Sequence, residues 1–382
     1  MHFIFGIAWI GASFYFVFLE NALNRSDLEN RDELAGHLWA IHGGGIYYLE
    51  KFKNAPQKMP RHLHWFKYEA YFTWITGIGL LFIVYYFNAQ SYLIDTQKAD
   101  IGTLMAVSIG IGSMIISWFF YDLISRTSLL KKRTAFFWVM FFFMVIVAFI
   151  LSQVFTGRGA FIHVGAIIGT LAVGNVFQVI IPSQKALVKA AEEGKEQDPS
   201  LGLHAQQRSY HNNYFTFPLL FIMISSHFPA TFGSSFNWII LAILSLASNG
   251  IKHFFNLLDR GERNYIYVGL ALVTIIGLII FTAPKQVVSE SQDAEQVSFE
   301  EINTIFKIRC ITCHSENPTD KIFVAAPNGV KFDKAEEIVK MKDRILNRVV
   351  QTKTMPLANQ SNMTDEERKK IEIWIAQGAK VE

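Results

Sequence analysis

Eight long apolar runs constrain the fold of this chain more than any other feature. They lie near residues 2–20, 70–88, 103–124, 134–155, 160–181, 213–228, 235–253 and 265–283. Runs of this kind cross the hydrocarbon core of a bilayer as α-helices. Hydrophobic residues make up 51% of the chain, which is high for a soluble protein of this size. We therefore predict an all-α fold whose first domain, residues 1–284, is an eight-span transmembrane helical domain.

The loops between these runs differ in charge. If they face the two sides of the membrane alternately, one set holds only Lys98 and Arg158 as basic residues. The other set is rich in Lys and Arg and comprises 21–67, 125–133, 183–211 and 252–264. Basic loops mark the cytoplasmic side, so we expect the N-terminus and everything after the eighth run to lie outside. The first run lacks the basic start and cleavage site of a signal peptide, so we expect a retained span.

A change in composition near Lys285 divides the chain. Charged residues are sparse before this point and dense after it. Residues 285–296 are polar and lack apolar periodicity, which predicts a linker to a separate domain at 297–382. The basic residues of the chain form no continuous stripe with interleaved aromatic residues, so we expect no nucleic-acid partner.

Residues 297–382 have the pattern of a small helical domain. Three pairs have the spacing of a capping box and predict three helix starts: Ser298 with Glu301, Asp333 with Glu336, and Thr364 with Glu367. Apolar residues at helical spacing predict two buried stripes: Ile302, Ile305 and Phe306, and Ile371, Trp374 and Ile375. A domain this short needs a further contribution to its core, and a bound porphyrin would supply one.

Both cysteines of the chain lie in one motif, Cys310-Ile311-Thr312-Cys313-His314. In C-x-x-C-H, the thiols form thioethers with haem vinyl groups and the histidine ligates iron. Half of a zinc site is the alternative, but no second Cys or His pair follows. We predict one covalent c-type haem in a class I-like cytochrome c domain. This haem is attached on the outer side of the bacterial membrane, which agrees with the loop charges and predicts a multi-pass protein of the inner (cytoplasmic) membrane.

The second axial ligand of this iron is predicted to be Met355. It precedes Pro356 in a segment without a helical pattern, which suits a loop that brings a thioether to the open face of the haem. Met341 and Met363 are the alternatives. A His/Met pair raises the potential of the iron and favours acceptance of electrons from a donor.

Histidines in the apolar part of the chain are the next candidates, because ligating side chains within spans usually face a cavity or a cofactor. The predicted topology puts His2, His163 and His227 at the outer ends of the first, fifth and sixth runs. At least two of them could bind an additional haem or metal. The alternative is that each one caps the end of its span.

Five segments carry a resemblance to a known family. They are His42-Gly43-Gly44-Gly45, Leu63-His64-Trp65-Phe66-Lys67-Tyr68-Glu69-Ala70-Tyr71, Tyr92-Leu93-Ile94-Asp95, His163-Val164-Gly165-Ala166 and His211-Asn212-Asn213-Tyr214. Together with the C-terminal haem motif, they resemble the bacterial membrane-bound cytochrome c urate oxidases, or urate hydroxylases. The resemblance implies oxidation of urate to 5-hydroxyisourate. It also implies that electrons leave through the cytochrome to a terminal oxidase or a soluble cytochrome c.

If the resemblance holds, a planar purine needs a site. His42, His211 and Asn212 fall toward the cytoplasmic side and are our candidate catalytic residues. The glycines after His42 would let backbone amides approach a ligand, and Asn212 offers both a donor and an acceptor. A flexible glycine turn and a loop asparagine are the alternative interpretation. Electrons from such a site would have to cross about 30 Å of hydrocarbon, which would require an intermediate cofactor.

A competing arrangement puts urate at the outer histidines beside the cytochrome, where they would act as acid–base groups. Two other functions stay open at this point. One is a dehydrogenase for quinol or another small molecule, which would need a pocket open to lipid. The other is an electron-transfer cytochrome c with a membrane anchor, although one span would suffice for anchoring.

Overall fold

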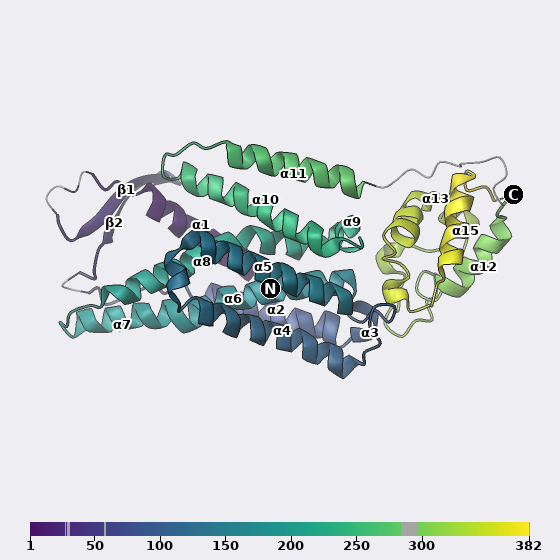
Figure 1. The fold of residues 1–382 in the computed structure, drawn as a ribbon, viewed down its shortest axis with the longest axis horizontal. Coiled ribbons are helices and arrows are strands. Elements are labelled where there is room, and N and C mark those ends of the chain that lie inside the picture. Colours follow the sequence, from purple (N-terminus) through teal and green to yellow (C-terminus); the bar gives the residue numbers. More distant parts are fainter. Residues whose placement is uncertain (27, 29–30, 57–58, 284–295, 382) are drawn as a thin grey trace.

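The computed structural model describes residues 1–26, 28, 31–56, 59–283 and 296–381. The chain is mostly helical, as predicted, and forms a long helical bundle with a small helical domain at one end (Figure 1). The predicted linker 285–296 lies outside the described residues, apart from residue 296.

Each predicted apolar run overlaps helical segments of the bundle, although several runs extend one or two residues beyond them. The long helices are α1 (His2–Ala22), α2 (Tyr68–Leu80), α4 (Thr103–Ile124), α5 (Arg133–Val154), α6 (Gly157–Gly174), α7 (Ile181–Glu192), α8 (Pro199–Ile224), α10 (Asn237–Leu258) and α11 (Ile266–Thr282). α2 continues into the π-helix η1 (Leu81–Tyr86), and the π-helix η3 (Asn175–Ile180) joins α6 to α7. Within the described residues, six helices are long and apolar enough to cross a membrane. α11 is apolar but shorter.

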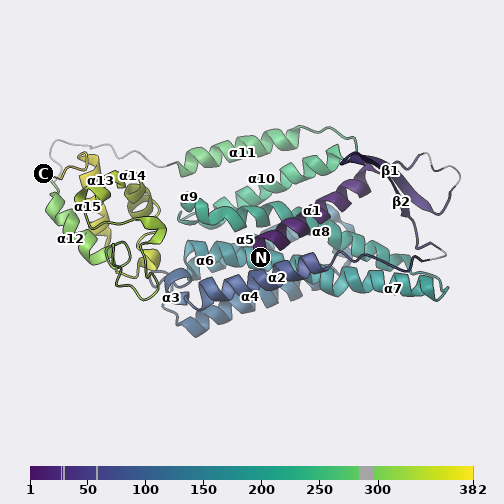
Figure 2. The ribbon, with the colours of Figure 1, turned by 180° about the vertical axis from the view of Figure 1, so that it is seen from behind.

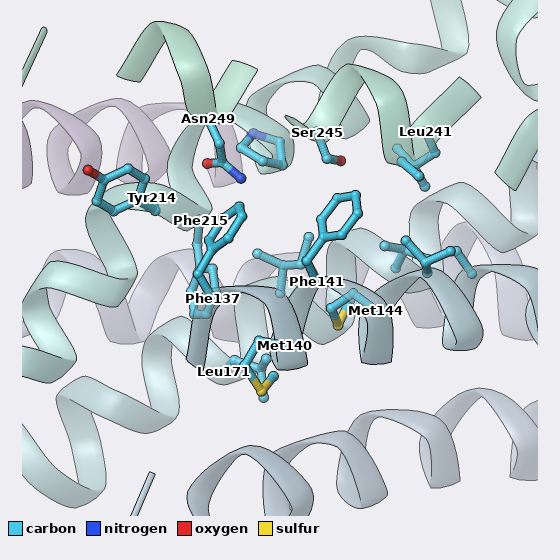
Figure 3. A pocket seen from close by; sticks show the side chains of 16 residues that line it. Phe137, Met140, Phe141, Met144, Leu171, Tyr214, Phe215, Leu241, Ser245 and Asn249 are labelled. Carbon is cyan, nitrogen blue, oxygen red and sulfur yellow. The ribbon is translucent and has the colours of Figure 1, made fainter. Parts of the chain in front are cut away.

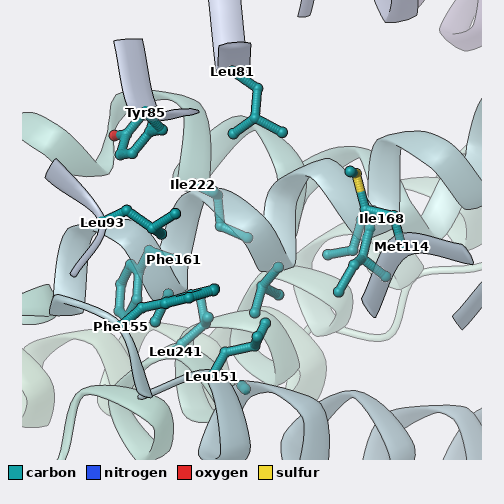
Figure 4. Close-up of a cluster of buried hydrophobic side chains, with 14 of the residues drawn as sticks. Leu81, Tyr85, Leu93, Met114, Leu151, Phe155, Phe161, Ile168, Ile222 and Leu241 are labelled. Atoms are coloured by element: carbon teal, nitrogen blue, oxygen red, sulfur yellow. The ribbon is translucent and has the colours of Figure 1, made fainter. Parts of the chain in front are cut away.

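The core of the bundle is built around α6, whose side chains are buried along most of its length. Leu151, Phe155, Phe161 and Ile222 belong to the same buried cluster (Figure 4). Glycine lets a neighbour pack closely here: a Cβ atom at Gly174 would lie 2.2 Å from Trp118 Cζ3. Close packing of small residues is how helices associate within a bilayer.

A β-hairpin follows α1 and was not predicted, because residues 21–67 were interpreted as a loop. Strand β1 (Leu34–His42) pairs with β2 (Gly45–Phe52) in antiparallel fashion, with His42 opposite Gly45. Gly43 and Gly44 make the turn with φ values of 57° and 80°, which glycine adopts without strain. The hairpin lies at one end of the bundle and the C-terminal domain at the other (Figures 1 and 2).

Short helices connect the long ones. They are α3 (Ala89–Tyr92), η2 (Ser128–Lys131), η4 (Ser225–His227) and α9 (Pro229–Phe232). The C-terminal domain contains α12 (Phe299–Arg309), η5 (Pro327–Gly329), α13 (Ala335–Lys340), α14 (Lys342–Ile345), η6 (Leu346–Gln351), η7 (Leu357–Asn359) and α15 (Asp365–Ala376). α12 packs on α15, and the predicted stripes meet there: Ile302, Phe306, Ile371 and Trp374 are all buried.

Two of the three predicted capping boxes form. Ser298 caps α12 and Thr364 caps α15, each with the glutamate three residues later. The third helix begins one residue later than predicted, with Lys334 as the N-cap and Glu337 accepting from its backbone N–H at 3.1 Å. Asp333 is not the cap because its carboxylate accepts hydrogen bonds from Ser315 Oγ and the backbone N–H of Glu316.

Candidate functional site

The Cys310–His314 motif forms a tight turn at the end of α12. The backbone N–H groups of Cys313 and His314 both donate to the Cys310 carbonyl, at 3.2 and 2.9 Å. His314 Nδ1 lies 2.9 Å from the carbonyl oxygen of Val330, to which it donates. Because this bond fixes the proton on Nδ1, Nε2 is left as a lone-pair donor for a metal, as is usual for a ligating histidine.

The two thiols of the motif are uncharged in this structure. Burial raises the pKa of Cys310 to about 12 and that of Cys313 to about 11, so both sulfurs are neutral at pH 7. A structural zinc site needs four ligands placed together. Among the described residues, no group of three or more His, Cys, Asp or Glu side chains is arranged to hold a metal ion. The donor set therefore fits a covalent haem better than zinc.

Arg368 holds the segment that carries Met355. Its guanidinium donates to the Met355 carbonyl at 2.7 Å, to Asn359 Oδ1 at 3.1 Å, and also to the Val349 carbonyl. Met355 packs against the same buried cluster as Cys310. Of the alternatives, Met363 is 1% exposed within that cluster, and Met341 Sδ lies 4.0 Å from Arg344 Nη1.

At the hairpin end of the bundle, His211 and Asn212 belong to a buried polar network. Asn175 Nδ2 donates to Asn212 Oδ1 and to the Tyr121 hydroxyl, both at 2.8 Å. The Tyr121 hydroxyl lies 2.8 Å from His211 Nδ1. Arg208 completes the network with an ion pair to Asp122 at 2.7 Å. Network members satisfy one another, which is what a buried polar group requires for stability.

The structure does not bring His42 to this network. His42 is exposed and lies at the hairpin turn, with Gly43 and Gly44 following it. A cavity of about 1120 Å³ lies beside the network and is lined by His211, but His42 does not line it. Of the three predicted catalytic residues, the structure therefore brings two together, His211 and Asn212.

The structure separates the three outer histidines. His2 Nδ1 lies 3.0 Å from the Thr73 carbonyl, whereas His163 Nε2 lies 3.1 Å from the Tyr86 hydroxyl. Thr73 and Tyr86 are thirteen residues apart on the continuous α2–η1 helix, which corresponds to roughly 20 Å along its axis. The other ring nitrogen of His163 donates to the Gly159 carbonyl at 2.8 Å, so this buried histidine has partners at both nitrogens. His227 is exposed and lies elsewhere, at the end of η4.

A second large cavity, of about 880 Å³, lies between the bundle and the C-terminal domain. The bundle contributes Arg158, His227 and Asn237, and the C-terminal domain contributes Arg348 and Met355. A hydrogen bond of 2.6 Å from Gln360 Nε2 to Ser91 Oγ joins the two parts at its edge. Sequence reasoning singled out His227 and Met355 but not the arginines. The sequence signal that could have identified Arg158 is that it is a rare basic residue in a set of loops with few basic residues.

A third pocket lies between α5, α8 and α10 and is much smaller, at about 100 Å³ (Figure 3). Its wall is apolar, with Phe137, Phe141 and Met144 on α5, and with Tyr214 and Asn249 at one end. Pockets for small molecules usually measure about 300–1,000 Å³. The two large cavities at the ends of the bundle are therefore the better candidates for a substrate.

Comparison with known proteins gives one match. The model of the family described as urate oxidase, N-terminal, matches residues 1–283, which contain the whole described bundle. No curated protein and no solved structure matched the chain. Both large cavities are lined by residues within this match. The chain therefore belongs to the urate oxidase N-terminal family.

Proposed function

We propose that this protein is a membrane-bound urate oxidase that passes electrons from urate to its own c-type haem. One observation carries the proposal: Met355, the predicted iron ligand, lines the same cavity as residues of the urate oxidase family domain. A donor bound in that cavity would lie next to the acceptor. The hydrogen bond between Gln360 and Ser91 supports this docked arrangement.

The reaction balances without dioxygen. Urate takes up one water molecule, gives 5-hydroxyisourate, and releases two electrons and two protons. A c-type haem accepts the electrons one at a time. The hydroxyl oxygen added to the purine therefore comes from water.

The residues that would hold the haem are all in the C-terminal domain. Cys310 and Cys313 would supply the two thioethers, and His314 and Met355 the axial ligands. Val330 fixes the ring of His314 through its carbonyl, and Arg368 fixes the backbone at Met355. These two contacts are the kind of support that sets the orientation of a ligand and hence the potential of the metal.

The location follows from the same arrangement. We propose that the bundle spans the bacterial inner membrane with all eight apolar helices, and that the C-terminal domain lies on the periplasmic side. The hairpin and this domain lie at opposite ends of the bundle, which supports the topology (Figure 1). A terminal oxidase or a soluble cytochrome c would then receive the electrons outside the cytoplasm.

The competing functions have less support. A quinol dehydrogenase needs a pocket open to lipid, and the apolar pocket beside α5 measures only about 100 Å³. An anchored electron carrier needs no cavity between the bundle and its haem domain. An additional cofactor at the outer histidines is also not needed when donor and acceptor share one cavity.

The source of the added oxygen tests the proposal. The purified full-length protein is supplied with urate and an artificial oxidant in ¹⁸O-labelled water without dioxygen. We expect turnover, with label in the hydroxyl group of 5-hydroxyisourate. Turnover that requires dioxygen, or unlabelled product, would reject the proposal.

A further inference from the structure

The cavity between the bundle and the C-terminal domain is lined mainly by positive charge. Its acidic residue is Asp95, and its basic residues are Lys98, Arg158, Arg344, Arg348, Lys353 and Arg368. Three of these are accounted for by partners. Lys98 donates to the backbone carbonyls of Ser152 and Phe155 and pairs with Asp95. Lys353 pairs with Asp365, and Arg368 donates to backbone carbonyls.

The other three arginines have no carboxylate partner among the described residues. Arg158 Nε donates to the Tyr85 hydroxyl at 3.0 Å, and its guanidinium lies over the Tyr85 and Tyr92 rings. Within the described part of the chain, the Arg344 side chain donates to the sulfur of Met341 at 4.0 Å and to no other group, and Arg348 donates no side-chain hydrogen bond. Burial first, and then the charges of Arg344 and Arg158, lower the pKa of Arg348, so these cations repel one another. An anion between them would remove this repulsion.

Asn237 supplies an independent sign of a ligand. Its side chain is 4% exposed and lines the cavity, and its Nδ2 donates to the Phe232 carbonyl at 3.0 Å. That bond fixes the orientation of the amide, and Oδ1 is then buried without a hydrogen-bond partner. A buried acceptor without a donor is costly, and a ligand N–H group would satisfy it once the Asn237 side chain moves enough to open Oδ1 to the cavity.

None of the described residues that line the cavity at the hairpin end has a buried side-chain acceptor without a partner. Arg25 and Lys51 both pair with Glu20 there, and Arg260 donates to Asn21 Oδ1 at 3.0 Å. Arg133 lies over the Tyr210 ring and is the matched counterpart of Arg158. Lys53 also lines this cavity and Glu20 is its acidic residue, so its positive charge is comparable. The feature that sets the cavity between the two domains apart is the unpartnered Asn237 Oδ1.

We propose that the cavity between the two domains is the urate site, with Arg158, Arg344 and Arg348 binding the anion and Asn237 accepting a purine N–H. This inference rests on the proposed function and names its substrate site. Urate at neutral pH is a planar anion with carbonyl acceptors and ring N–H donors. It matches three cations without carboxylate partners among the described residues and one acceptor without a donor. The catalytic candidates His42, His211 and Asn212 would then have no contact with urate.

The test compares urate affinity at the two cavities. Arg158→Gln and Arg348→Gln remove charge from the proposed site, and Arg133→Gln removes the matched charge at the other end. KM is measured with an artificial oxidant, and the dissociation constant by anaerobic equilibrium dialysis with labelled urate. Haem spectra and thermal midpoints report folding. Arg344→Gln is a second variant because Arg344 is exposed and its replacement is tolerated structurally.

We expect KM and the dissociation constant for urate to rise about tenfold or more in Arg158→Gln and Arg348→Gln, since a hydrogen bond to a charged group is involved. Arg344→Gln should show a smaller rise in the same direction, and Arg133→Gln should stay within about twofold of the unmodified protein. Unchanged affinity in the interface variants, or a loss confined to Arg133→Gln, overturns the site but not the function. Absence of urate binding and turnover in the unmodified protein rejects the proposed function itself.

Discussion

Gln360 in the C-terminal domain donates a hydrogen bond of 2.6 Å from Nε2 to the hydroxyl oxygen of Ser91, a buried residue of the bundle. Nearby, the C-terminal domain also approaches Gly233 of the bundle, where a Cβ atom would lie 2.7 Å from Thr354 Cγ2. These contacts hold Met355 at the wall of the shared cavity. Docking of the two domains is therefore part of the proposed electron path.

Loss of the Gln360 contact should slow electron transfer. A hydrogen bond of this kind contributes about 1 kcal/mol, which corresponds to roughly a fivefold change in the docked population where docking is marginal. We expect Gln360→Ala to slow haem reduction by urate by up to that factor in rapid mixing. Lys307→Ala is the control, because Lys307 is exposed on α12 and does not line the cavity. Equal slowing in both variants would argue against docking as the cause.

Replacement of Arg368 should weaken the Met355 segment without loss of the covalent haem. Arg368→Gln removes hydrogen bonds from a buried cation to three acceptors. We expect the free energy of unfolding of the C-terminal domain to fall by about 3 kcal/mol and the haem potential to drop. Lys369→Gln removes an exposed pair with Glu372 and should change stability by less than about 0.5 kcal/mol. Denaturant titration and redox titration measure both effects.

Covalent attachment has a direct test on gels. Denatured protein stained for haem peroxidase activity should show a band that is lost in the Cys310→Ala, Cys313→Ala double variant. Met355→Ala should keep the band and lower the potential, because a thioether ligand raises it. An unchanged potential would transfer the axial role to Met341 or Met363. A band that persists in the double variant would refute the haem assignment.

His227 is the outer histidine that lines the shared cavity and is our candidate for a proton acceptor there. Without it, Asp95 is the remaining base that lines the cavity, and its carboxylate is paired with Lys98 at 3.8 Å. We expect His227→Gln to lower kcat about a hundredfold with little change in KM. His204→Gln, at an exposed position of α8, should behave like the unmodified protein. A normal kcat in His227→Gln would exclude this role.

The helices were largely predictable from the sequence, because long apolar runs and capping residues act locally. Ser298 and Thr364 cap helices where their spacing indicated. Asp333 does not, because its carboxylate is used by Ser315, and no spacing rule reveals such a contact between distant residues. The hairpin was missed because its strands are exposed and follow no clean alternation, although Gly43-Gly44 was an available turn signal.

The candidate site was predictable only in part. Cys310, Cys313 and His314 form a local pattern with a known chemistry, and with Met355 they stay a prediction for the haem. His227, predicted from its position at the end of a run, lines the shared cavity. Arg158 and Arg348 are 190 residues apart and meet only because the C-terminal domain docks on the bundle. The depth of a histidine in the membrane could not be predicted from its position in the sequence either. His2 and His163 were predicted to lie at the same side, but His2 contacts Thr73, which is far along the helix from the Tyr86 that His163 contacts.

Anaerobic mixing of urate with the oxidised, purified protein tests the central claim most directly. We predict the absorption spectrum of a reduced c-type haem within the time of one turnover, with about two haems reduced per urate consumed, because each haem takes one electron. A structural analogue of urate that cannot be oxidised should leave the haem oxidised. A haem that stays oxidised in the presence of urate, or urate that is consumed only when dioxygen is admitted, would contradict the account.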